Sequence, residues 1–167
     1  MKSSQPLKVL TIAGSDSGGA AGLQADLKTF AALGAYGMSV VTVVTAQNSR
    51  QVAATQPIPV ALVAAQIEAV LQDYGAAAIK SGFLGSAALI ETVAASLAPY
   101  RKEEAPPLVV DPVLVNHRGA SMFGEEVANA YRQWLLPGCT LVTPNLHEAA
   151  LLCGQRVETW SEVMAAA

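Results

Sequence analysis

Two carboxylates in the second half of the sequence, Asp111 and Glu148, are the side chains best suited to hold a divalent cation. Mg²⁺ is typically held by one or two carboxylates, with water and phosphate oxygens completing its shell. Asn145 stands three residues before Glu148, where it would cap the helix that carries this acid. Two alternatives stay open: Asp111 could form a turn before Pro112, and Glu148 could complement a helix dipole.

Gln47 and Asp26 are candidates for recognising a small polar molecule. The Gln47 amide can donate and accept hydrogen bonds at once, as recognition of a heterocycle requires; an ordinary loop amide is the alternative. Asp26 lies one turn into a predicted helix, from where its carboxylate could reach a ligand in the preceding loop. A solvated helix carboxylate is the alternative.

The loop in question lies within the stretch from Ala13 to Asp26, AGSDSGGAAGLQAD. Its glycines allow tight turns and let a ligand approach the backbone closely. The helix that follows would offer unpaired N–H groups and the positive end of its dipole. We therefore expect a polar or anionic ligand here, with a purely structural turn between strand and helix as the alternative.

The sequence resembles three well-known motifs but contains none of them in full. The spacing of a phosphate-binding P-loop begins at Gly14, but Ala20 and Ala21 stand where Lys and Ser/Thr are required. The dinucleotide pattern G-x-G-x-x-G does not fit the glycines in any register. His147 and Glu148 begin the zinc motif H-E-x-x-H, but Leu151 occupies the position of the second histidine, so no zinc site is expected.

Hydrophobic periodicity predicts alternating strands and helices around these residues. The predicted strands cover residues 7–13, 38–45, 77–80, 108–111 and 140–143, and the predicted helices 20–33, 60–74, 86–97, 123–136 and 145–153. Residues 51–59 are predicted to form a loop or irregular strand. Ser86, Ser121 and Asn145 are the predicted caps of their helices, and Leu62 is predicted to face the core.

This alternation predicts βαβ units in a mainly parallel sheet, with the ligand beyond the carboxyl ends of the strands. Polar residues follow five predicted strands at that edge: Ser15 and Asp16, Gln47 and Asn48, Lys80 and Ser81, Asp111, and Asn145 with Glu148. The loop that holds His117, Arg118 and Gly119 could bind an anion, although a solvated loop is favoured.

The composition and net charge of the chain limit the kinds of binding partner that we expect. Of 167 residues, 52% are hydrophobic and 14% charged, and the net charge is −3, which argues against nucleic acid or an anionic membrane as a main partner. No stretch reaches the ~18 apolar residues of a membrane span, so we expect a soluble, cytoplasmic protein. Cys139 and Cys153 have no metal or redox spacing and are expected to be reduced thiols.

The stretch AGSDSGGAAGLQADLKTFAALGAYGMSVVTVVTAQN resembles the N-terminal part of the hydroxymethylpyrimidine/phosphomethylpyrimidine kinase family of thiamine biosynthesis. KSGFLGS, VVDPVLV and VTPNLHEA resemble later motifs of that family, in the right order. The similarity extends over essentially the whole chain. It implies one ribokinase-like domain over residues 1–167, a three-layer α/β/α fold with a mainly parallel sheet, whose C-terminal part is missing.

The resemblance implies phosphoryl transfer from ATP, with Mg²⁺, to 4-amino-5-hydroxymethyl-2-methylpyrimidine and then to its monophosphate. The residues implied to bind the substrate are Gly14, Asp26, Gln47 and Phe83, and those implied for the phosphate and Mg²⁺ region are Asp111, Asn145 and Glu148, with Asp111 and Glu148 nearest the metal. The implied partner is this small molecule, with a homodimer left open.

The chain departs from the family pattern in three ways. Ala20 replaces a common glycine, and Phe83 stands where a methionine usually lines the pyrimidine pocket. The family's Gly-Thr-Gly-Cys motif and catalytic base would lie beyond Ala167, so no catalytic residue is expected in this chain. A pyridoxal kinase of the same fold, or an inactive fragment that acts only in binding, are the alternative functions.

Overall fold

A six-stranded sheet runs through the computed structural model, which describes residues 5–101, 105–116 and 119–166. In spatial order the strands are β3 (Val52–Pro57), β2 (Tyr36–Gln47), β1 (Lys8–Asp16), β4 (Ala78–Ser81), β5 (Leu108–Val110) and β6 (Leu141–Val142). All neighbouring pairs are parallel except β2 and β3, which are antiparallel. The predicted mainly parallel α/β sheet is confirmed.

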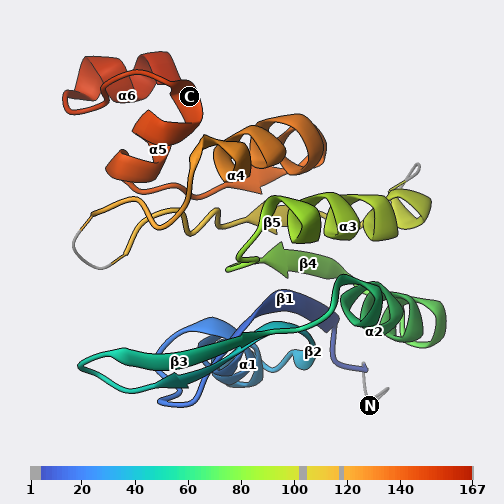
Figure 1. Ribbon diagram of the computed structural model, residues 1–167. Helices are drawn as coiled ribbons and strands as arrows, with labels where there is room; N and C mark the ends of the chain where they lie inside the picture. The colour runs from blue at the N-terminus through green and yellow to red at the C-terminus, as the bar shows by residue number, and fades with distance from the viewer. Residues whose placement is uncertain (1–4, 102–104, 117–118, 167) are drawn as a thin grey trace.

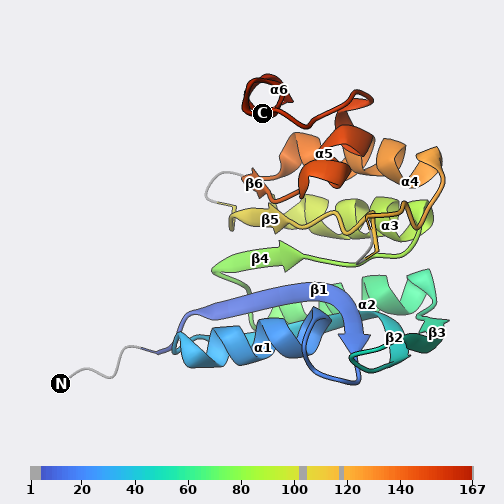
Figure 2. The same cartoon turned by 90° about the vertical axis from the view of Figure 1, so that its left-hand side faces the viewer.

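Helices cover both faces of this sheet (Figure 1, Figure 2). The helix α1 (Gly22–Ala32) packs against β1 and β2 on one face. On the other face lie α2 (Val60–Asp73), α3 (Ala87–Leu97) and α4 (Glu125–Ala130), which continues as a π-helical turn, Tyr131–Leu135, and a 3₁₀ turn, Leu136–Gly138. The chain then passes through β6 to α5 (Leu146–Cys153) and α6 (Trp160–Ala166).

The register of β1 and β4 decides which side chains enter the core and which face α1. Leu10 pairs with Ile79, Thr11 with Lys80, and Ile12 with Ser81. Because successive side chains of a strand point to opposite faces, Thr11 and Lys80 share the face covered by α1. The apolar members of the other set lie in the main core together with Val40, Val110 and residues of α2–α4.

Two strands extend further than the hydrophobic pattern predicts. β1 continues to Asp16 and β2 to Gln47, because Ser15 and Asp16 pair with β2 and Gln47 pairs with β3. The segment predicted as a loop or irregular strand contains β3, whose pairing with β2 shifts register between Ala46 and Gln47, so the irregular strand is confirmed. A turn organised by the Asn48 carboxamide, whose Oδ1 accepts from the N–H groups of Arg50 and Gln51, joins it to β2.

One of the two predicted serine caps is found at the start of its helix and the other is not. Ser86 caps α3 as predicted, with its Oγ accepting from the Leu89 N–H at 3.2 Å. Ser121 does not cap α4; Gly124 takes that position, and the Ser121 hydroxyl donates to the Phe123 carbonyl at 2.8 Å.

Leu62 is 52% exposed, so the prediction that it faces the core is wrong. The buried stripe of α2 consists of Val63, Ile67 and Leu71, which recur every fourth residue and so lie on one side of the helix. His117 and Arg118 lie outside the described residues. Every helix in the described part of the chain is too short or too polar to cross a membrane.

Candidate active site

The loop between β1 and α1 is organised by the carboxylate of Asp16. Its Oδ1 accepts a hydrogen bond from the Gly18 N–H at 2.8 Å, and its Oδ2 accepts from the N–H groups of Ala20 and Ala21 at 2.9 Å each. Burial alone would raise the pKa of Asp16, but these backbone donors hold that pKa below its usual value. The N–H groups of Gly18, Ala20 and Ala21 are therefore bound within the protein, whereas the N-terminus of α1 has no side-chain cap.

The same loop is tied to the end of β2. The Ser17 hydroxyl donates to the Gln47 carbonyl at 2.8 Å and accepts from the Gln47 N–H at 2.7 Å. On the helix side, the Gln24 carboxamide accepts from the Asp16 N–H and donates to the Ser15 hydroxyl, both at 2.8 Å. The predicted pyrimidine-binding residue Gln47 thus holds a defined position relative to the glycine loop.

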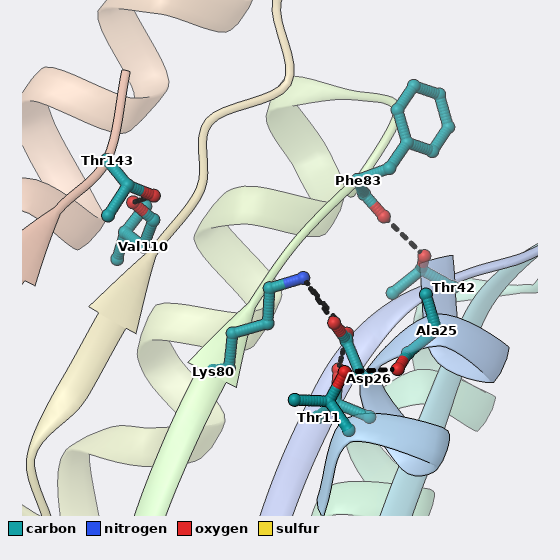
Figure 3. Close-up of polar contacts among 9 residues, drawn as sticks. Thr11, Ala25, Asp26, Thr42, Lys80, Phe83, Val110 and Thr143 are labelled. Carbon is teal, nitrogen blue, oxygen red and sulfur yellow. Dashed lines mark hydrogen bonds and ion pairs between the residues drawn. The ribbon is translucent and has the colours of Figure 1, made fainter. Parts of the chain in front are cut away.

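Two glycines allow a close backbone approach in this region. A Cβ on Gly14 would lie 3.3 Å from Cδ1 of Phe83, so the bare backbone of β1 fits against this ring. Gly22 has a φ of +56°, and a Cβ there would lie only 2.3 Å from the Gly14 carbonyl oxygen. Phe83 is itself held by Phe123, whose ring centroid lies 5.8 Å away, and by a 2.7 Å hydrogen bond from the Thr42 hydroxyl to its carbonyl (Figure 3).

Asp26 projects from α1 toward β4 and forms an ion pair with Lys80 (Figure 3). The Lys80 Nζ lies 2.9 Å from both carboxylate oxygens of Asp26, and the Thr11 hydroxyl donates to Oδ2 at 2.6 Å. The side chains of Lys80 and Asp26 are 24% and 16% exposed. Both oxygens of the predicted substrate-binding residue Asp26 therefore have partners within the protein.

Asp111 follows β5 and belongs to the same charge cluster. Burial raises its pKa; the positive charge of Lys80 and the N–H of Val113 oppose this, while the negative charges of Glu148 and Asp26 add to it. Beneath them Tyr131 is buried, and burial together with the charges of Asp111 and Glu148 raises the pKa of its phenol. The charges of Lys80, Glu148 and Asp26 thus all act on Asp111, which groups the three predicted acidic residues in one electrostatic neighbourhood.

The loop after Asp111 is strained. Val113 has a φ of +39°, a left-handed conformation that a β-branched residue rarely adopts. Such conformations persist only where the surroundings impose them, and they concentrate at functional sites. The Leu114 N–H, one residue further on, donates to Oε1 of Glu148 at 3.0 Å and so anchors this turn.

Asn145 and Glu148 form a capping box at the start of α5, which confirms Asn145 as the predicted helix cap. The Asn145 Oδ1 accepts from the Glu148 N–H, and Oε2 of Glu148 accepts from the Asn145 N–H, both at 3.0 Å. Since its other oxygen holds Leu114, the Glu148 carboxylate joins α5 to the loop that carries Asp111. Glu148 is 4% exposed, and each of its carboxylate oxygens accepts a hydrogen bond from a backbone N–H, so this side chain stabilises the folded loop.

A cavity of about 640 Å³ lies beside this site rather than in it. Leu114, Phe123 and His147 are among its lining residues, as is Gly119 of the loop predicted as a possible anion site. None of the residues predicted for the substrate or for Mg²⁺ lines it. The candidate site is accordingly placed by the grouping of polar and charged side chains at the carboxyl edge of the sheet.

The sequence of this chain matches a known protein family. Residues 16–167 match the family described as phosphomethylpyrimidine kinase. The chain belongs to the phosphomethylpyrimidine kinase family. Among relatives of this kinase family, the hydroxymethylpyrimidine/phosphomethylpyrimidine kinase of Streptomyces coelicolor is 50% identical over 162 residues, which are 97% of this chain and 59% of that protein. The family resemblance drawn from the motifs is confirmed.

Solved structures agree with the phosphomethylpyrimidine kinase assignment. The phosphomethylpyrimidine kinase of Clostridium difficile is similar with a TM-score of 0.88 and 38% identity, over 96% of this chain and 68% of that one. The pyridoxal kinase of Staphylococcus aureus, in complex with AMP-PCP and pyridoxal, gives a TM-score of 0.83 at 36% identity, over 98% of this chain and 58% of that one. The chain spans about half the length of most of the curated relatives it matches.

Lys80 is one of the polar residues that the sequence places at the carboxyl ends of the predicted strands, whereas no sequence pattern singled out Thr11. Both stand in strands of otherwise apolar character, and a polar group in such a place needs a partner. That signal was present at Thr11, within the run Leu10–Ala13. The identity of the partner, Asp26, depends on how α1 packs and could not be read from the strand alone.

Proposed function

We propose that this chain carries the acceptor side of a kinase of thiamine biosynthesis. The reaction transfers phosphate from ATP to the hydroxyl group of 4-amino-5-hydroxymethyl-2-methylpyrimidine and then to the resulting monophosphate. The observation that carries the proposal is that Phe83 lies against the Gly14 backbone while Ser17 of the same glycine loop holds the backbone of Gln47. Relatives with 45–50% identity that bear this name support it.

In this reaction the residues of the site would divide between binding the pyrimidine and holding the phosphate and metal. The Gln47 carboxamide hydrogen-bonds the pyrimidine, whose ring lies along the Gly14 backbone and against Phe83. Asp111 stands at the phosphate and metal region, where Asn145 and Glu148 hold its loop in place. Phosphoryl transfer depends on positioning and charge neutralisation more than on covalent help, and these side chains suit that task.

The donor set fits Mg²⁺ as a kinase uses it. Among the described residues there is no group of three or more His, Cys, Asp or Glu that would form an all-protein metal site. Mg²⁺ in kinases is instead held by one or two carboxylates together with substrate phosphates and water. Asp111 would provide the direct carboxylate, and the ion would neutralise phosphate charge. Glu148, whose two oxygens accept from the N–H groups of Leu114 and Asn145, would contribute its negative charge to this region.

A binding measurement tests the acceptor assignment. Calorimetry of the 167-residue chain with the pyrimidine alcohol should show saturable binding, and Gln47→Leu should weaken it at least about tenfold, because the ligand's amino group or a ring nitrogen would lose its partner. Gln56→Leu, an exposed carboxamide on β3, is the matched control. Absence of binding by the unmodified chain would contradict the proposal.

Pyridoxal kinase is the second candidate, favoured by the structural similarity to the Staphylococcus aureus enzyme. Phe83 in place of the usual methionine changes the pocket wall and so bears on this choice. Titration with pyridoxal under the same conditions separates the two. Tighter binding of pyridoxal than of the pyrimidine alcohol would reverse the assignment.

The remaining parts of the proposal are a single domain over residues 1–167, a cytoplasmic location, and self-association as a homodimer left open. The net charge of −3 supports a small-molecule partner over nucleic acid.

A further inference from the structure

Lys80 stands between the two halves of the candidate site. Its side chain rises from β4 toward the carboxyl ends of the strands (Figure 3). Its Nζ pairs with Asp26 at 2.9 Å, and its positive charge also acts on Asp111, whose pKa it lowers against the effect of burial. Lys80 is therefore a cation that interacts with residues proposed for both parts of the site.

The local backbone leaves room for the ammonium group at this place. A Cβ on Gly82 would lie 3.1 Å from the Lys80 Nζ and equally 3.1 Å from Cβ of Ala13. Gly82 directly precedes Phe83, and Ala13 directly precedes Gly14. The ammonium group thus lies beside Gly82, one residue before Phe83 of the proposed acceptor wall.

The ion pair with Asp26 leaves donor capacity on Lys80. A lysine ammonium has three N–H donors, and its hydrogen-bond partners within the described residues are the two oxygens of one carboxylate. The Lys80 side chain is also 24% exposed, so a ligand can reach it. Asp26, in turn, is held by the Thr11 hydroxyl, which limits the positions open to the pair.

The two acceptors of the proposed reaction differ in charge at this position. The alcohol is neutral at its hydroxymethyl group, whereas the monophosphate brings a dianion toward Asp111 and Glu148. Without a nearby cation, two carboxylates would repel that phosphate. A charge-assisted hydrogen bond from a fixed ammonium is the interaction that would favour it.

We propose that Lys80 binds the phosphate group of the phosphorylated acceptor, and that Asp26 and Thr11 are positioning residues that hold its ammonium group. This assignment rests on the proposed function and refines it. Lys80 discriminates between the two acceptors: it contributes to binding of the monophosphate and little to binding of the alcohol. Asp26 acts through Lys80 rather than by contact with the pyrimidine.

Calorimetric titration of both acceptors, without nucleotide or metal, tests the assignment on the 167-residue chain. Lys80→Met should weaken binding of the monophosphate at least about tenfold while changing that of the alcohol less than about twofold. Lys80→Met also leaves Asp26 without its counter-ion, so Lys80→Met combined with Asp26→Asn is measured as well and should show the same selective loss. Lys8→Met, at the opposite end of the sheet, should change neither affinity.

Three outcomes of these titrations would contradict the proposed role of Lys80. Equal losses for both acceptors in the charge-balanced double variant would overturn it, since they would show a merely structural ion pair. If the unmodified chain bound the alcohol but the double variant bound the monophosphate as tightly as the unmodified chain does, the inference would fail while the proposed function stood. Failure of the unmodified chain to bind either compound would overturn both.

Discussion

At the scale of single residues, Asp16 shows how a carboxylate can replace a ligand in an N–H-rich loop. Gly18, Ala20 and Ala21 present their N–H groups inward to one carboxylate, so the loop has its final shape before any substrate arrives. A preformed wall loses less entropy on binding than one that must be ordered by the ligand.

The lowered pKa of Asp16 has a consequence for the pH dependence of stability. The pKa is lower in the folded state than the value near 3.8 expected when unfolded, so the unfolded state binds more protons between these values. The stabilisation is therefore fully present above about pH 4 and is lost as the pH falls through the folded-state pKa. Thermal unfolding of wild type and Asp16→Asn from pH 6 to pH 2 should show a smaller acid-induced decrease in Tm for the variant.

The control for that series is Asp73→Asn, which removes one exposed carboxylate at the end of α2. It accounts for the general effect of net charge on Tm. A decrease in Tm as steep in Asp16→Asn as in wild type would show that this carboxylate does not stabilise the folded loop.

Gly22 provides a second residue-scale prediction. Gly22→Ala combines a left-handed φ with a clash at the Gly14 carbonyl, whereas Gly34 has a φ of +75° and no heavy atom within 4 Å of the place that a Cβ would take. Gly34→Ala should therefore cost about 1 kcal/mol of unfolding free energy, the conformational part alone. Gly22→Ala should cost about 1–3 kcal/mol more, because the backbone must also move apart. Urea unfolding followed by circular dichroism measures both, and equal costs would contradict the clash.

At the scale of elements, the contact between α2 and β2 compensates for a gap in the sheet. β3 pairs with β2 only from Val43 onward, so Val41 lies beyond the end of this ladder. The Gln66 carboxamide takes the place of a strand there: its Oε1 accepts from the Val41 N–H at 3.0 Å, and its Nε2 donates to the Val41 carbonyl at 3.1 Å. A side chain of α2 thus completes the edge of β2.

Removing the Gln66 carboxamide should destabilise the protein, because the N–H and carbonyl groups of Val41 lose their partners. Gln66→Ala is expected to lower the unfolding free energy by about 1–3 kcal/mol, because a partly buried N–H and carbonyl lose their partners. Gln72→Ala, on the same helix, removes only an exposed hydrogen bond to Glu68 and should change stability by less than about 0.5 kcal/mol. Similar unfolding free energies for the two variants would show that solvent replaces the Gln66 contacts.

At the scale of the whole molecule, the site residues divide between the two halves of the sheet. The acceptor residues lie on or directly after β1, β2 and β4, and the phosphate-side residues follow β5 and β6. Large exposed apolar side chains occur along the last elements, on β6, α5 and α6: Leu141, Leu146, Trp160 and Met164. Such surface on consecutive elements is typical of faces that are covered by other protein.

The family's Gly-Thr-Gly-Cys motif does not occur in these 167 residues, which leads to a prediction about activity. We expect the 167-residue chain to bind the acceptor but to form no ADP above background with ATP, Mg²⁺ and the pyrimidine alcohol, because charge stabilisation at the transferred phosphate is incomplete. A coupled ADP assay measures this, with the Streptomyces coelicolor relative as the active reference. Robust ADP formation by this chain would contradict the prediction.

The sequence by itself determined the order of strands and helices, the parallel α/β class, the caps Ser86 and Asn145, and the gathering of polar residues at the carboxyl edge. Each of these depends on local periodicity or on groups within four residues of each other, which a linear pattern contains. The family motifs then predicted which of those residues bind a substrate.

Only the tertiary structure decided which polar groups already have partners. Asp26 meets Lys80 across 54 residues and Ser17 meets Gln47 across 30, and both pairings follow from how α1 and β2 pack against β1. Asp16 was one of several polar residues in a glycine-rich loop until the fold of that loop directed its N–H groups at this carboxylate. Hydrogen bonds and ion pairs act over about 3 Å, and such distances between remote residues are set by packing and register, not by spacing along the chain.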